Sequence, residues 1–164
     1  MIPQGAGCYN IELMWHTTDP GFWVTEEGLA RAVSFHGHRG SFLIVGLRMG
    51  ALILRELGTK GHWPLRIRCF AARPPVSCFV DGLQLSTGCT LGKGNISAED
   101  RNACEARAEL EDEYGIRVVV VRLRDEVRER IESSFGQCEE VEAEIENYLL
   151  RASEEELFQI TREI

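Results

Sequence analysis

The segment 42–57 constrains the fold of this chain more than any other feature of its sequence. Its apolar residues occur around most of the circumference of a helix, and charge interrupts it only at Arg48 and near its end. Such a helix has to be buried on nearly all sides, so it lies at the centre of a fold. Gly46 and Gly50, one turn apart, indicate that another backbone approaches closely. That backbone belongs either to the sheet of the same domain or to a second copy of the chain.

Cap residues mark the limits of this helix and of the one before it. Thr25 is a suitable N-cap, since its hydroxyl oxygen can accept a backbone N–H bond, and the helix it begins should run to about Phe35. Ser41 is predicted to cap the central helix, which should end before Gly58. Residues 1–24 are expected to form an irregular arm.

After residue 64 the hydrophobic period changes. Residues 65–69 alternate apolar side chains with arginine, and residues 116–123 are β-branched, so both are predicted strands. Residues 76–85 fit a strand or a short helix, and about 98–113 is predicted as a polar helix. From residue 125 onward the pattern is that of charged helices with one break, so we expect one domain, 1–124, followed by a helical C-terminal extension, 125–164.

The net charge, the hydropathy and the cysteine spacing indicate which partners, location and metal motifs are compatible with this sequence. The chain has 18 Lys and Arg against 26 Asp and Glu, and this net charge of -8 argues against a nucleic-acid partner. No apolar run of about 18 residues predicts a membrane span, and no secretory signal is apparent, so a cytoplasmic location is expected. Reduced thiols are then expected, and none of the six cysteines forms a C-x-x-C pair typical of zinc ribbons.

The H-G-H segment is one candidate for chemistry. On extended backbone His36 and His38 would point to one side, and neutral imidazoles are good ligands for zinc, nickel or iron. The pair would lie beside the N-terminus of the central helix, where backbone N–H groups can hold an anion. Cys78 or Cys89 would complete a three-ligand site with an open fourth position, as catalytic zinc uses.

A glycine-rich loop at 86–95 is the other candidate. Cys89 is its possible catalytic nucleophile, and Lys93 is placed to bind an anion. The spacing G-x-x-x-G-K is one residue short of a nucleotide P-loop, which we therefore exclude. The positions of this loop that could approach a cofactor or ligand closely are Gly88, Gly92, Gly94 and Asn95.

These motifs together resemble the FmdE-like family, named for one of the subunits of formylmethanofuran dehydrogenase. The resemblance covers residues 30–97: F-H-G-H, a glycine-bearing helix ending in L-R-E-L-G, then C-F-V-D-G-L-Q and T-G-C-T-L-G-K-G-N. It implies an α+β fold, with a mixed β-sheet and packed helices, that is often dimeric. It also implies a metal site, usually zinc, whose ligand candidates and surrounding shell are His36, His38, Cys78 and Cys89, with Asp81, Gln84 and Lys93.

The chain departs from the family at two places. Members commonly read H-G-H-x-C-P-G, whereas Gly40 stands here at the cysteine position. Arg39 adds a cation that disfavours a metal unless a thiolate or carboxylate offsets it. The C-terminal zinc ribbon of many members is replaced by acidic helices.

Three hypotheses follow. The first is a zinc-binding protein, associated with oxidoreductases, that serves a molybdenum or tungsten enzyme complex in an accessory or metal-handling role and forms a homodimer. The second is a non-catalytic dimeric interaction module with a degenerate metal site. The third is a thiol enzyme that uses Cys89.

Overall fold

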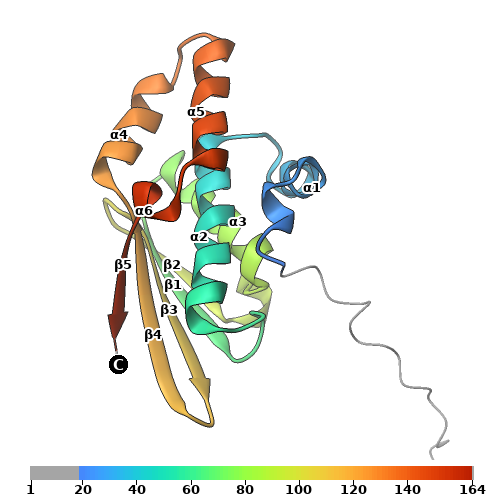
Figure 1. The fold of residues 1–164 in the computed structure, drawn as a ribbon, viewed down its shortest axis with the longest axis vertical. Helices are drawn as coiled ribbons and strands as arrows, with labels where there is room; N and C mark the ends of the chain where they lie inside the picture. Colours follow the sequence, from blue (N-terminus) through green and yellow to red (C-terminus); the bar gives the residue numbers. More distant parts are fainter. Residues whose placement is uncertain (1–18, 164) are drawn as a thin grey trace, which may run out of the picture.

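Helices pack on one face of a five-stranded β-sheet in the computed structural model, which describes residues 19–163 (Figure 1). The strands are β1 (Leu65–Ala71), β2 (Ile96–Asp100), β3 (Cys104–Asp112), β4 (Gly115–Leu123) and β5 (Phe158–Glu163). The helices are α1 (Glu26–His36), α2 (Ser41–Leu57), α3 (Phe79–Thr87), α4 (Asp125–Ser134), α5 (Glu139–Arg151) and α6 (Glu154–Leu157), with short 3-10 turns η2 (Phe22–Val24), η3 (Val76–Cys78) and η4 (Leu91–Lys93).

The sheet is mixed. Its order is β2-β1-β3-β4-β5, in which β1 and β2 run parallel and the other neighbouring strands run antiparallel. The α+β fold with a mixed sheet and packed helices, expected from the family resemblance, is confirmed. None of the helices in the described part of the chain is long and apolar enough to cross a membrane.

Helix α2 lies at the centre of this arrangement, as its apolar sequence predicted. A β-carbon at Gly46 would lie 2.0 Å from the carbonyl oxygen of Phe79, and one at Gly50 would lie 2.0 Å from Oγ of Ser86. Gly82 of α3 likewise meets the α2 backbone closely. The close approach is therefore confirmed, and the approaching element is α3 of the same chain rather than the sheet or a second copy.

Arg48 is the one charged residue in the middle of α2, and it joins that helix to α5. Its guanidinium donates to the carbonyl oxygens of Leu149 (2.8 Å), Leu150 (3.0 Å) and Ala152 (2.9 Å). These carbonyls lie at the C-terminus of α5, where backbone acceptors lack helical partners and a cation is favourable. Burial lowers the pKa of Arg48, and the three hydrogen bonds compensate for the lost solvation.

Two helix predictions need correction. The predicted polar helix at 98–113 is wrong, because this region forms the end of β2 and all of β3. Alanine and glutamate favour helices, but Ala106, Ala108 and Leu110 are buried alternately with polar neighbours, which is the two-residue period of a strand. Ser41 is the first residue of α2 rather than its cap, since the N-cap is Gly40 and makes no side-chain bond.

Other local predictions are confirmed. The hydroxyl oxygen of Thr25 accepts from the backbone N–H of Gly28 and caps α1. Gly58 ends α2 in the left-handed conformation, β1 and β4 form where predicted, and the segment 76–85 is mainly helical.

The C-terminal segment completes the sheet. Residues after 124 form α4, α5 and α6, as the helical pattern predicted, but they end in the edge strand β5. This strand pairs antiparallel with β4, with Val121 opposite Ile160. The sequence analysis did not predict β5. Helix α5 packs against α2, α4 packs against α5, and α6 returns the chain to the sheet (Figure 1).

Candidate metal centre

The two histidines of the H-G-H segment lie at the end of α1. His36 is the last residue of the helix, and Gly37 follows in the left-handed conformation with φ 98° and ψ -19°. The expectation of extended backbone is therefore wrong. The left-handed turn nevertheless folds His38 back beside His36, so that the ring centroids are 4.6 Å apart and the planes are inclined by 41°.

His36 is fixed by a carboxylate from another helix. Its Nδ1 lies 2.7 Å from Oδ2 of Asp81 in α3, and its side chain is only 7% exposed. Because a carboxylate accepts, Nδ1 is the donor of this contact, and in a neutral imidazole the lone pair is then on Nε2. That Nε2 atom is buried and has no hydrogen-bond partner in the described part of the chain. A metal-ligating imidazole has this arrangement in many proteins.

Asp81 connects the histidines to the glycine-rich loop. Nε2 of Gln84 donates to Oδ1 of Asp81 (3.2 Å), and Oε1 of the same amide accepts from the backbone N–H of Leu91 (3.1 Å). Cys78 lies about one helical turn before Asp81 and is half-buried. Burial, and then the charge of Asp81, raises the pKa of the Cys78 thiol. Cys78 is therefore a thiol rather than a thiolate unless a cation lies close to it.

Cys89 lies in a different environment from the histidines. It is 0% exposed, and its Sγ lies 3.5 Å from the carbonyl oxygen of Leu65 and 3.8 Å from that of His62. Burial raises its pKa to about 11. A nucleophilic cysteine requires the opposite shift and an accessible sulfur. Within residues 19–163, no contact joins Cys89 to His36 or His38, and the structure brings Cys78 rather than Cys89 to Asp81.

The remaining polar residues of the loop bind its own backbone and the neighbouring segment 62–65. Nζ of Lys93 donates to the carbonyl oxygen of Gly88 (2.6 Å) and lies 3.2 Å from Nδ1 of His62. The amide of Asn95 donates to the carbonyl oxygens of His62 and Leu65, both at 3.1 Å. His62 has a positive φ of 59°, which is unusual for a residue other than glycine. Much of the T-G-C-T-L-G-K-G-N motif therefore has a structural explanation.

The glycines of this loop differ in backbone conformation. Gly88 and Gly94 have positive φ values of 69° and 66°, and each ends a helical turn. Gly92 does not have a positive φ. Three residues could stand in for the family cysteine that is absent at position 40. His62 contacts Lys93 and the carbonyl oxygen of Thr87, Cys69 is buried in β1, and His16 lies outside the described residues.

Gly40 and Arg39, where the H-G-H segment departs from the family, lie directly beside the histidines. A β-carbon at Gly40 would be 3.1 Å from Nε2 of His38, so the position of the family cysteine adjoins this ring. Nε of Arg39 donates to Oε2 of Glu146 in α5 at 2.7 Å, which turns its cation toward a carboxylate. No sequence signal could have identified this contact, since 107 residues separate the two.

The donor set fits a metal ion only in part. Across residues 19–163, no three His, Cys, Asp or Glu side chains are arranged to hold a metal. His36 has the orientation of a ligand, and His38 is beside it. Further ligands would have to come from Cys78, which lies about one helical turn before Asp81, from water or from a bound molecule.

Comparisons with known proteins identify the family. The family model described as "FmdE, Molybdenum formylmethanofuran dehydrogenase operon" matches residues 35–159. A "probable S-adenosyl-L-methionine-binding protein" of Archaeoglobus fulgidus is 33% identical over 96 residues, which are 56% of this chain and 26% of that protein. This chain thus spans about a quarter of its length.

A solved structure shares the fold. The crystal structure of a tungsten formylmethanofuran dehydrogenase FmdE-like protein from Syntrophus aciditrophicus superposes with a TM-score of 0.62. The match covers 84% of this chain and 71% of the other at 20% identity. Because the family model covers most of the sequence, from the H-G-H segment to β5, this chain belongs to the FmdE family.

Proposed function

We propose that this FmdE-family chain binds a divalent transition metal, zinc in the first place, at His36 and His38. We further propose an accessory or metal-handling role beside a molybdenum or tungsten formylmethanofuran dehydrogenase. The single observation that carries the metal proposal is the state of His36. Its Nδ1 is held by Asp81 at 2.7 Å, while its buried Nε2 has no hydrogen-bond partner among the described residues.

A buried polar nitrogen without a partner costs about 1–3 kcal/mol. A metal ion would supply the missing partner, and the carboxylate of Asp81 would make the imidazole a stronger ligand. His38 offers a second imidazole at a centroid distance of 4.6 Å. A zinc ion bound there would supply Lewis acidity or hold a thiol or carboxylate ligand. Glu146 supports this site by pairing with Arg39, the cation that would otherwise repel a metal.

Thiol chemistry has less support than metal binding. Burial raises the pKa of the thiols of Cys69, Cys78, Cys89 and Cys104. The ammonium of Lys93 contacts the carbonyl oxygen of Gly88 and the ring of His62. A binding or accessory role therefore fits these residues better than catalysis. The enzyme partner rests on the description of the family, and the homodimer and the cytoplasmic location remain predictions.

The test is elemental analysis and zinc titration of the untagged protein. Wild type should hold near one zinc per chain, and H36A/H38A should hold almost none. C78S tests the third ligand, and C138S is its control, because Cys138 is an exposed thiol outside the site. A wild type that stays free of metal after dialysis against zinc would overturn the proposal and favour the interaction module.

S-adenosyl-L-methionine is titrated into the same proteins as a second probe, since the archaeal relative carries that name. If wild type binds this compound and not zinc, and H36A/H38A binds neither, the site is assigned to the organic ligand. If wild type binds zinc alone, the metal assignment stands.

A further inference from the structure

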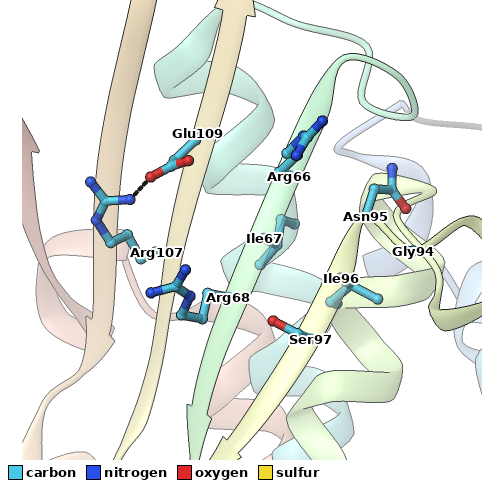
Figure 2. Close-up of a pocket in the computed structure, with 9 residues that line it drawn as sticks. All are labelled: Arg66, Ile67, Arg68, Gly94, Asn95, Ile96, Ser97, Arg107 and Glu109. Atoms are coloured by element: carbon cyan, nitrogen blue, oxygen red, sulfur yellow. Dashed lines mark ion pairs between the residues drawn. The ribbon is translucent and has the colours of Figure 1, made fainter.

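We propose that the open face of the sheet carries a second binding site, for a small phosphorylated compound, built from three arginines. A hollow of about 220 Å³ lies over β1, β2 and β3 (Figure 2). It is lined by the arginines Arg66, Arg68 and Arg107, together with Glu109, Ser97 and the turn at Gly94. This site is independent of the metal proposal.

The hollow lies on the face of the sheet that turns away from the helices. Arg66 and Arg68 are exposed, whereas Leu65, Ile67 and Cys69, which alternate with them in β1, are buried in the core. The histidines lie on the helical side, since Asp81, the partner of His36, belongs to α3 and α3 packs on α2. The test of one site can therefore give a negative result while the test of the other gives a positive one.

The register of the sheet places like charges together in this hollow. Arg68 of β1 lies directly opposite Arg107 of β3, and Arg66 is two residues away on the same face. Two like charges directly opposite in an antiparallel pair destabilise a sheet. Figure 2 shows the side chains of Arg68 and Arg107 extending over neighbouring strands, whereas Arg66 lies further along β1, over its own strand. The register also sets Glu109 opposite Arg66, so the lining holds three guanidinium groups beside one carboxylate.

Nearby carboxylates pair with two of these three arginines. Arg107 pairs with Glu109 and with Glu163, and Nε of Arg68 approaches Glu99 only to 3.7 Å. Within residues 19–163, no ion pair or side-chain hydrogen bond involves Arg66. The lining thus contains three guanidinium groups and one carboxylate, in a chain whose net charge is -8.

The arrangement of donors favours a tetrahedral oxyanion. Each guanidinium presents a planar fork of N–H donors that matches two oxygens of a phosphate or a carboxylate. A phosphate group has enough oxygens, and a charge near -2 at neutral pH, to engage more than one fork, whereas a carboxylate has two oxygens and one charge. Ser97 adds a hydroxyl to the lining. A volume of about 220 Å³ is below the roughly 300–1,000 Å³ of most small-molecule pockets, so the organic part of the ligand is small.

The test is calorimetric titration with inorganic phosphate, with sodium chloride used to keep the ionic strength constant. We compare wild type with R66A/R68A and with the control R31A/R73A. The control removes the same charge from two exposed arginines that each form a surface ion pair elsewhere. Phosphate should bind wild type and the control with similar affinity, and R66A/R68A at least about tenfold more weakly.

Three results would overturn the proposal. The first is that phosphate does not bind wild type more than chloride does. The second is that phosphate binds R66A/R68A as tightly as wild type. The third is that R31A/R73A loses as much affinity as R66A/R68A, which would indicate non-specific attraction. Tighter binding of succinate than of phosphate would overturn the ligand class. Chemical-shift changes at the backbone amide of Ser97 on adding phosphate would support the location, and their absence would count against it. Zinc binding should be unchanged in R66A/R68A, which separates this test from that of the metal centre.

Discussion

Nδ1 of His36 lies 2.7 Å from Oδ2 of Asp81, although 45 residues separate the two along the chain. The contact joins the end of α1 to the first turn of α3. It is possible because glycines let α2 and α3 approach closely, so α3 brings its carboxylate beside the H-G-H turn. The orientation of the proposed metal ligand thus depends on the packing of the two helices.

Replacing Asp81 with Asn should weaken zinc binding without unfolding the protein. The amide keeps the size of the side chain but loses the charge that makes His36 a strong ligand, and such changes typically reduce metal affinity about 10–100-fold. Competition with a chromophoric chelator measures the affinity. D125N is the control, because Asp125 is an exposed carboxylate on α4. An unchanged affinity in D81N would show that Asp81 has no part in binding.

Glu146 should protect the site from the charge of Arg39. Glu146→Gln removes the carboxylate that Nε of Arg39 contacts at 2.7 Å and leaves the guanidinium with Glu26, at 3.8 Å, so less negative charge offsets it and zinc affinity should fall severalfold. Arg39→Ala should restore it. In the R39A background the E146Q change should have almost no effect, and a double-mutant cycle on zinc affinity measures this coupling. Two additive losses would mean that Glu146 acts independently of Arg39.

The sequence predicted those parts of the fold in which a local pattern decides the structure. The uniform hydrophobicity of α2 and the β-branched run of β4 identified both elements. β3 was missed because Ala and Glu are good helix formers. Its alternation of buried and polar residues specifies a strand only when β3 pairs with β1 and β4. β5 was missed because a six-residue edge strand after an acidic helix has little pattern of its own.

The candidate site was predictable to a similar extent. The motifs identified His36, His38, Cys78 and Asp81 as residues that belong together, and the structure brings His36, His38 and Asp81 into contact. Cys89 belongs to the same motifs but supports the loop, because its burial and its carbonyl partners depend on the tertiary fold. Neither the contact between Arg39 and Glu146 nor the opposition of Arg68 and Arg107 follows from any local pattern.

Gly46→Ala should destabilise the protein strongly. The new β-carbon would lie 2.0 Å from the carbonyl oxygen of Phe79, so α2 and α3 would have to separate, at a cost of about 3 kcal/mol or more. Urea denaturation measures the free energy of unfolding. Gly92→Ala is the control, because its nearest neighbour would be 4.0 Å away, and it should change stability by less than about 0.5 kcal/mol. Similar stability in both variants would show that α2 and α3 do not pack as described.

The buried thiols should make stability fall at alkaline pH. Burial raises the pKa of Cys89 to about 11 and that of Cys69 to about 12, from an ordinary value of 9.0. Between pH 9 and 11 the unfolded chain therefore loses protons that the folded chain keeps, so the free energy of unfolding decreases as pH rises, by up to about 1.4 kcal/mol per pH unit for each thiol. Urea denaturation at pH 8 and pH 10 measures the decrease.

Cysteine to alanine variants identify the source of this pH dependence. C89A should show a shallower decrease than wild type between pH 8 and pH 10, because one of the groups that titrates only on unfolding is gone. C138A should behave as wild type, since Cys138 is exposed. Alkylation at pH 8 adds a second readout, in which Cys138 reacts in the folded protein and Cys89 reacts only after unfolding. Rapid alkylation of Cys89 in the folded state would contradict its burial and favour the thiol-enzyme hypothesis over metal binding.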